Sequence, residues 1–172
     1  MDTMATRLDR RLRACDLDAL PHEWDTRYEL IAGVLHMSRR PSFEHQAFLG
    51  NLLVRIGPAV FEVGGHVVPD LAILLRVPRP PRGEKLRTCP DIVVEVMSGG
   101  EIGRTRDLVD KRDLYLRSGA LEYWIVDLDA RILLRLVRSG NAWQEERLGP
   151  SDRLSTPLLP GWEGVVLADL LD

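Results

Sequence analysis

Residues 90–97 read PDIVVEVM, and a second stretch of similar character, LEYWIVD, follows at residues 121–127. Both stretches are rich in β-branched and aromatic residues, which are enriched in strands. The first is apolar on both of its alternating faces apart from its acidic residues, a pattern typical of a strand that is buried on both faces. We therefore expect a protein of the broad α/β class with an α+β arrangement: helices flank a mixed sheet that is built around residues 90–97.

Capping residues predict the helix boundaries around this strand. Ser42 is a suitable N-cap for a helix that ends near Ile56, where Gly57–Pro58 stops it. A second helix is predicted over 104–118, with Gly119 at its C′ position. The other expected elements are an amphipathic helix over 5–19, a hairpin over 28–38 that turns near Ala32–Gly33, a hairpin over 61–75 that turns at Gly64–Gly65, a strand over 131–137, and short strands in the tail.

The composition is that of one soluble globular domain. The 172 residues are 45% hydrophobic and 28% charged, which predicts a single domain over 1–172 with an N-terminal helical segment over 1–20. Two cysteines are too few for a disulfide framework or a cysteine-based zinc site. No apolar run approaches the roughly 20 residues of a membrane span, and the N-terminus lacks a signal-peptide block. We expect a cytoplasmic protein without a membrane partner.

Two acidic residues interrupt the apolar strands and become neighbours if the strands pair. Asp70 lies in VVPDLAILL at 67–75, and Glu95 lies in the strand at 90–97. If these strands are antiparallel with position 75 opposite position 90, Asp70 faces Glu95 at about 5 Å. Like charges so placed favour a bound cation or a shared proton. Asp91 is on the same strand face as Glu95 but roughly 13 Å away, which is too far to share one ion.

A lysine on the second predicted helix completes this group. Lys111 stands with Leu108 and Tyr115 on one helix face, so its ammonium must find an anion, either a carboxylate or a phosphate. Each residue also has a plainer interpretation. Asp70 could begin a strand, Glu95 could pair with an arginine, and Lys111 could extend along the surface. Glu29 could pair within its hairpin, and His45 could be a hydrogen-bonded helix residue. Taken together, Asp70, Glu95 and Lys111 favour a functional site over these separate structural interpretations.

The order of these segments resembles a known family. The matching segments are YELIAGVLHMS, EHQAFLGNLL, VVPDLAILL, CPDIVVEVMSGG, RDLVDKRDLYLRSGALEYWIVD and TPLLPGWEGVVLADLL. In this order they resemble the Uma2 family, bacterial proteins of restriction-endonuclease-like fold that belong to the PD-(D/E)XK superfamily and are described as nucleases. The resemblance covers about residues 20–172 and is most specific at PDIVVEVMS, DLVDKRDLY and GALEYWIVD. It implies a restriction-endonuclease-like core.

The resemblance also implies roles for individual residues. Asp70 matches the metal-binding aspartate of the first core strand, and Glu95 matches the acidic residue of the second. The superfamily's usual lysine position, two residues after that acid, is occupied here by Met97. Lys111 matches the position on the following helix to which the lysine has moved in similar proteins. The further family positions matched are Glu29, His45 and Asp91, of which Asp91 is expected to be structural. The stretch 57–68 is shorter than in much of the family, which could alter the substrate edge.

The resemblance predicts a nuclease that depends on Mg²⁺ or Mn²⁺. Asp70 and Glu95 would hold the ion, with the main-chain carbonyl of Val96 as a further ligand, and Lys111 would act on a bound water. DNA is favoured over RNA as the substrate, and a homodimer is the family-level expectation. The basic residues of the loop at 76–88 would contact phosphates or simply be solvated: Arg79, Arg82, Lys85 and Arg87.

Two other functions compete with this interpretation. The first is a binding module that keeps the nuclease fold with little or no catalysis. The net charge of −3 and the absence of the strand lysine favour it. The second is acid–base hydrolysis of a sugar or ester by the paired carboxylates, whose expected spacing suits a retaining glycosidase. The scattered tryptophans do not suggest a sugar-binding cleft, so this interpretation ranks last.

Overall fold

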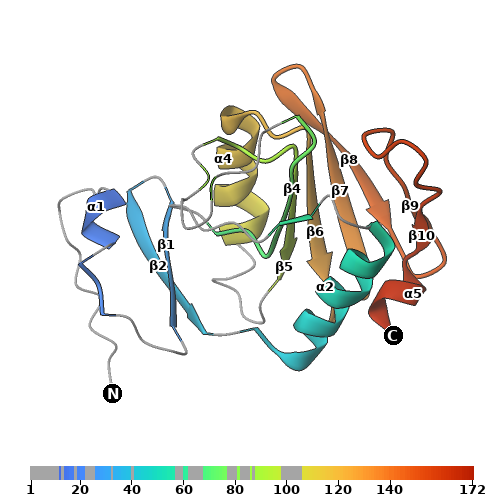
Figure 1. Cartoon of the computed structure of the whole chain (residues 1–172), viewed down its shortest axis with the longest axis horizontal. Helices are drawn as coiled ribbons and strands as arrows, with labels where there is room; N and C mark the ends of the chain where they lie inside the picture. The colour runs from blue at the N-terminus through green and yellow to red at the C-terminus, as the bar shows by residue number, and fades with distance from the viewer. Residues whose placement is uncertain are drawn as a thin grey trace.

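A computed structural model of the chain describes residues 12, 14–17, 19–21, 26–31, 33–39, 41–56, 60–61, 68–76, 81, 86, 88–97 and 106–172. Its centre is a six-stranded mixed sheet with the strand order β3-β4-β5-β6-β7-β8 (Figure 1). These strands are β3 (Val60–Phe61), β4 (Leu71–Ile73), β5 (Ile92–Val96), β6 (Glu122–Asp127), β7 (Ile132–Ser139) and β8 (Ala142–Leu148). The expected α+β architecture is thus confirmed.

The remaining elements surround this sheet. Strands β1 (Thr26–Ile31) and β2 (Val34–Arg39) form a separate antiparallel hairpin, and β9 (Arg153–Leu154) pairs with β10 (Val165–Val166). The helical elements are α1 (Ala14–Leu17), α2 (Phe43–Ile56), the π-helical turn η1 (Arg106–Asp110), α4 (Lys111–Ser118) and α5 (Ala168–Leu171). Among the described residues, none of these helices is both long and apolar enough to cross a membrane.

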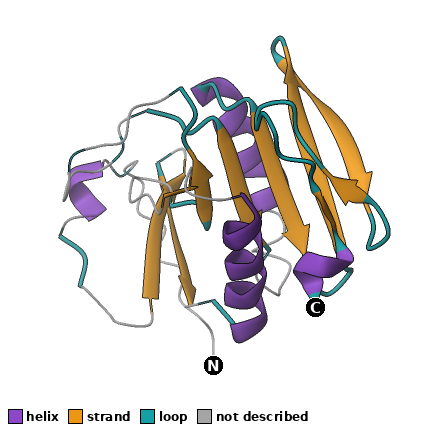
Figure 2. Cartoon of the chain, turned by 45° about the vertical axis from the view of Figure 1, so that its right-hand side comes forward, coloured by secondary structure: helices purple, strands orange, loops and turns teal. Residues whose placement is uncertain are grey.

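Strand β5 is the centre of the fold, as its sequence predicts. All of its residues are buried, and it pairs antiparallel with β4 and parallel with β6. A parallel pair requires a crossover, which η1 and α4 provide between the two strands. Helices α2 and α4 lie on opposite faces of the sheet (Figure 2). Ile92, Val94 and Val96 therefore pack in the core cluster beneath α2, whereas Val93 packs in the cluster beneath α4.

Both predicted helix caps are present. The Ser42 hydroxyl accepts the backbone N–H of His45 at 3.3 Å, which caps the start of α2. Gly119 has a left-handed backbone with φ of 101°, and its N–H donates to the carbonyl of Tyr115. One correction concerns the start of the second helix. Its first described turn is π-helical rather than α-helical, so Lys111 is the first α-helical residue.

Two predicted elements are shorter in the described part of the structure, and one helix is new. Among the described residues, β4 spans 71–73 of the predicted strand, and α1 spans 14–17 of the helix expected over 5–19. Residues 1–11, 57–59 and 62–67, where parts of these predictions fall, lie outside the described residues. Helix α5 was not predicted. It packs against α2, where the Asn51 side-chain amide donates to the carbonyl of Leu170 at 3.4 Å.

A second buried acid ties the C-terminal segment to the sheet. Glu122 of β6 is 1% exposed. Its oxygens accept hydrogen bonds from Arg135 at 2.7 and 2.9 Å, from Trp124 Nε1 at 2.8 Å and from the Thr156 hydroxyl at 2.6 Å. The Trp124 ring also stacks on Trp162 with centroids 6.3 Å apart. Glu122 is therefore a structural carboxylate whose charge is balanced by Arg135.

We predict that Gly164→Ala will destabilise this C-terminal segment strongly. Gly164 has φ of 79°, and an added Cβ would overlap the carbonyl oxygen of Leu154 on the paired strand. Gly140 is a matched control, because its φ is 62° but an added Cβ meets nothing within 4 Å. Urea unfolding should show a loss of about 1 kcal/mol for Gly140→Ala and about 3 kcal/mol for Gly164→Ala. Equal losses would contradict the prediction.

Candidate active site

Strands β4 and β5 bring the predicted acids together. Their register pairs Leu71 with Val94, which continues to position 70 opposite position 95, as the sequence predicts. Asp70 precedes β4 at a bend, and its Oδ2 accepts the backbone N–H of Val96 at 2.8 Å. This hydrogen bond fixes the Asp70 carboxylate at the end of β5, beside Glu95.

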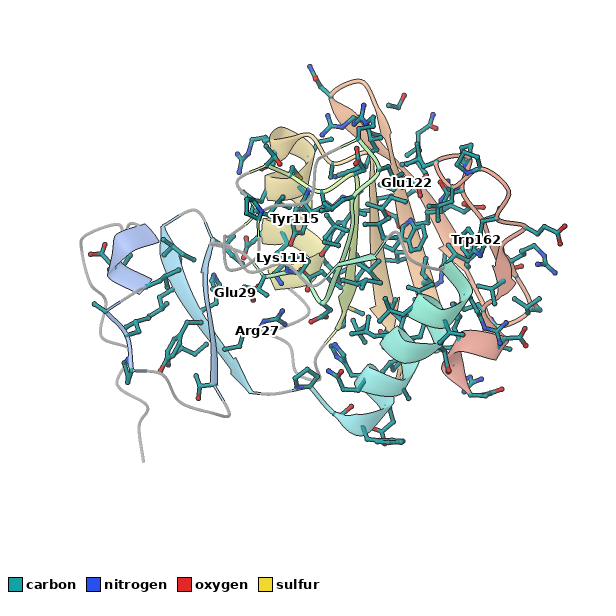
Figure 3. All side chains as sticks on the ribbon, viewed as in Figure 1. Arg27, Glu29, Lys111, Tyr115, Glu122 and Trp162 are labelled. Atoms are coloured by element: carbon teal, nitrogen blue, oxygen red, sulfur yellow. The ribbon has the colours of Figure 1, made fainter. Side chains whose placement is uncertain are left out.

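Lys111 is buried between two glutamates. Its Nζ lies 2.9 Å from Glu95 Oε1 and 3.1 Å from Glu29 Oε1, and all three side chains are at most 2% exposed. Figure 3 shows Glu29 on β1 and Lys111 on α4 extending toward one another. The alternatives of a surface lysine and of a Glu29 that pairs only within its hairpin are therefore wrong. Glu29 Oε1 also accepts the backbone N–H of Val68 at 3.1 Å.

Tyr115 is a further residue that contacts Glu95. The sequence indicates only that it shares a helix face with Lys111. Its hydroxyl donates to Glu95 Oε1 at 3.0 Å. Lys111 and Tyr115 are four residues apart on α4, so both side chains reach the same oxygen of Glu95. Burial, followed by the charge of Glu95, raises the pKa of Tyr115 well above its ordinary value. The Tyr115 hydroxyl therefore stays protonated and donates a hydrogen bond to Glu95.

Asp70 is held on both oxygens by cationic or N–H donors. Arg27 of β1 donates to Oδ1 at 2.7 Å, and Nε2 of His45 on α2 lies 3.3 Å from Oδ2. Burial alone would raise the pKa of Asp70. The hydrogen bond and charge of His45 and the Arg27 guanidinium outweigh burial and lower the pKa to about 2. Asp70 is therefore an anion at neutral pH.

These six side chains form what we call the carboxylate cluster: Arg27, Glu29, His45, Asp70, Glu95 and Lys111. Its three carboxylates pair with two cations: Arg27 pairs with Asp70, and Lys111 pairs with Glu29 and Glu95. Counted without His45, the three carboxylates outnumber these two cations by one. A bound cation would balance the remaining negative charge, which is costly when it is buried.

The donors in the cluster suit a hard divalent cation such as Mg²⁺ or Mn²⁺. Asp70 and Glu95 provide carboxylate oxygens at neighbouring strand positions, and oxygen is the ligand that these ions prefer. Within the described part of the chain, no three His, Cys, Asp or Glu side chains converge closely enough to hold a metal ion. An ion here would therefore be held by two carboxylates, with main-chain and water oxygens completing its coordination.

The other predicted residues lie outside this cluster. Asp91 Oδ2 accepts the backbone N–H groups of Leu75 and Arg76 at 2.7 and 2.8 Å, which is the loop-capping contact expected of a structural aspartate. Met97 packs against the apolar cluster beneath α4. The four loop residues predicted to contact nucleic acid lie outside the described residues: Arg79, Arg82, Lys85 and Arg87.

Sequence reasoning missed Arg27. Side chains alternate along a strand, so Arg27 and Glu29 share one face of β1. Because Glu29 is a candidate site residue, this alternation indicates that Arg27 points to the same side of β1. The sequence did not indicate that the hairpin face meets Asp70, which lies 43 positions away.

Comparison with known proteins supports a nuclease-like fold. A family model described as "Uma2: Putative restriction endonuclease" matches residues 15–170. A solved structure, described as "a putative nuclease belonging to DUF820 from Anabaena variabilis ATCC 29413", is similar with a TM-score of 0.71. The match covers 93% of this chain and 97% of that chain at 19% identity, so it establishes the shared fold. No match was found among curated proteins.

We predict that Asp70 makes stability depend on acid pH. Its folded-state pKa of about 2 is below the ordinary value of 3.8, so its contribution is present above about pH 4 and disappears as the pH falls through 2. That contribution is about 2 kcal/mol. Chemical unfolding at pH 7 to 2 should show a weaker acid dependence for Asp70→Asn than for wild type. Asp172→Asn, at a carboxylate that is 71% exposed, should keep the wild-type dependence. An unchanged slope in Asp70→Asn would contradict the prediction.

We also predict that Lys111 is essential for stability because its partners are buried. Lys111→Met leaves Glu29 and Glu95 without their shared cation and should cost about 3–5 kcal/mol at pH 7. Adding Glu95→Gln to Lys111→Met removes one of the two charges and should restore part of the loss. Urea unfolding measures both variants. A double variant no more stable than Lys111→Met would refute this account of the cluster.

Proposed function

The chain belongs to the Uma2 family, and on this basis we propose that it is a nuclease that hydrolyses phosphodiester bonds of nucleic acid with Mg²⁺ or Mn²⁺. The observation that carries the proposal is that three buried charged residues are brought together. Glu95 of β5 contacts Lys111 of the helix that joins β5 to β6, and Asp70, directly before β4, is opposite Glu95 and hydrogen-bonded to Val96. Buried titratable groups with specific charged partners are frequent at functional sites.

Asp70 and Glu95 would hold the ion, with the main-chain carbonyl of Val96 as a further ligand. The bound ion would polarise the scissile phosphate and lower the pKa of an attacking water. The ion pair with Lys111 and the hydrogen bond from Tyr115 orient one oxygen of Glu95. The backbone N–H of Val96 orients Oδ2 of Asp70 in the same way. These contacts preorganise both carboxylates.

Lys111 would steady the attacking water and offset the negative charge that develops on the phosphate in the transition state. Glu29 also contacts the ammonium and accepts the Val68 N–H. We assign Glu29 the role of a positioning residue, because it holds Lys111 against Glu95. His45 and Arg27 keep Asp70 ionised, which a metal ligand requires.

We propose DNA rather than RNA as the substrate, because the family is described as one of restriction endonucleases. Cutting both strands of a duplex requires two sites, so we further propose that the protein acts as a homodimer, in the cytoplasm. These finer assignments rest on the family description and on the sequence.

A second candidate function is nucleic-acid binding with little catalysis. Two observations favour it: the strand position of the superfamily lysine holds the apolar Met97, and both Asp70 oxygens already have protein partners. In that case the charges of the cluster would serve only to join the hairpin, α2 and α4. Metal-dependent cleavage distinguishes the two functions.

We predict that the protein cleaves supercoiled plasmid or single-stranded DNA with Mn²⁺ or Mg²⁺ and does not cleave in EDTA. Glu95→Gln and Asp70→Asn should each lower the cleavage rate by about a hundredfold or more, since each removes a charged ligand. Glu146→Gln is a matched control at an exposed glutamate that pairs with Arg135, and it should cleave like wild type. RNA is tested in parallel, and circular dichroism checks that each variant is folded.

Equal cleavage by wild type, Glu95→Gln and Asp70→Asn would indicate a contaminating nuclease and contradict the proposal. Failure of the wild type to cleave any substrate, together with retained DNA binding, would favour the binding function instead.

A further inference from the structure

The carboxylate cluster is open to solvent at one of its members. Five of its six side chains are almost inaccessible, since Glu29 and Lys111 are 1% exposed, Glu95 2%, Asp70 3% and His45 9%. The Arg27 side chain is 27% exposed. Figure 3 shows it extending from β1 toward the sheet, beside Glu29. A molecule that approaches the cluster from solvent therefore meets Arg27 first.

Arg27 keeps its positive charge in this position. A guanidinium is not deprotonated in proteins, and the adjacent Asp70 carboxylate stabilises its charged form. Its NH1 donates to Asp70 Oδ1 at 2.7 Å, and its NH2 donates to the carbonyl of Pro69 at 3.2 Å. These two contacts account for two of the five N–H groups of a guanidinium.

Asp70 does not depend on Arg27 alone. When the guanidinium moves away, Asp70 Oδ2 keeps the N–H of Val96 and the nearby His45. Losing Arg27 therefore leaves a carboxylate that still has polar partners, which costs far less than a buried charge with none. Because ion pairs with an exposed partner are weak, the partly exposed Arg27 can exchange Asp70 for a competing anion.

We propose that Arg27 is a substrate-binding residue, which exchanges Asp70 for a backbone phosphate of nucleic acid at the entrance to the carboxylate cluster. This inference rests on the proposed function and extends it to the group that receives the substrate. The planar guanidinium can donate two parallel hydrogen bonds to a phosphate, which an ammonium cannot. The bound phosphate would then lie next to Asp70, Glu95 and Lys111.

Binding without cleavage tests the proposal. The affinity for fluorescently labelled single-stranded DNA is measured by anisotropy in EDTA at several salt concentrations. Arg27→Met should weaken binding by about tenfold or more and reduce the slope of log K against log salt by about one. Arg27→Lys should lie between wild type and Arg27→Met. Arg112→Met is the matched control, because Arg112 is also paired, with Glu145, and 33% exposed; it should bind like wild type.

A second pair of variants tests the exchange itself. Asp70→Asn removes the competing carboxylate, so it should tighten DNA binding. Arg27→Met in the same chain should abolish that gain if Arg27 carries it, whereas a gain that persists would reflect only the removal of a negative charge. If Arg27→Met fails to fold, the comparison of Asp70→Asn with Asp70→Asn/Arg27→Lys decides instead, with a loss of at least half of the gain expected.

The outcomes separate this inference from the proposed function. Wild-type affinity in Arg27→Met, or a wild type that binds no DNA, would overturn the role of Arg27 whatever the cleavage assay finds. Weaker binding by Arg27→Met, with the gain of Asp70→Asn lost in the double variant, would support that role even if the wild type cleaves nothing.

Discussion

A buried ammonium needs carboxylates, and this requirement determines how the parts of the molecule are joined. Lys111 is inaccessible to solvent and contacts Glu29 and Glu95. Because an unpaired charge in a core costs several kcal/mol, the hairpin that carries Glu29 has to dock where α4 and β5 meet. The same docking brings Arg27 to Asp70. The separate two-stranded sheet thus becomes part of the site without sharing a strand with the main sheet.

The sequence predicts the parts of the site that depend on short-range geometry. A two-residue alternation and one antiparallel pairing are sufficient to place Asp70 opposite Glu95, because the register of two strands is fixed once one pair is known. The caps at Ser42 and Gly119 follow from local hydrogen bonding. These predictions succeed because each needs only residues that are close along the chain or joined by one loop.

Other parts follow from packing between distant segments and could not be predicted. Arg27 and Glu29 meet partners about 40 to 80 positions away, and the alternation of β1 does not indicate what its face will contact. The two glutamates Glu95 and Glu122 look alike in sequence, since each sits within an apolar strand. They differ in what surrounds them: Glu122 is paired with Arg135 from the next strand, whereas Glu95 faces Lys111 from a helix.

Placing the lysine on α4 also changes how the site is assembled. A lysine on the same strand as the acid would keep its spacing by covalent connection, whereas here the spacing depends on the docking of a helix against a sheet. Partial opening of α4 would dismantle the site while β4 and β5 stayed paired, because local segments can open below the free energy of global unfolding. The integrity of the site therefore depends on the docking of α4, and a fragment that ends after β5 would contain the three carboxylates but not Lys111.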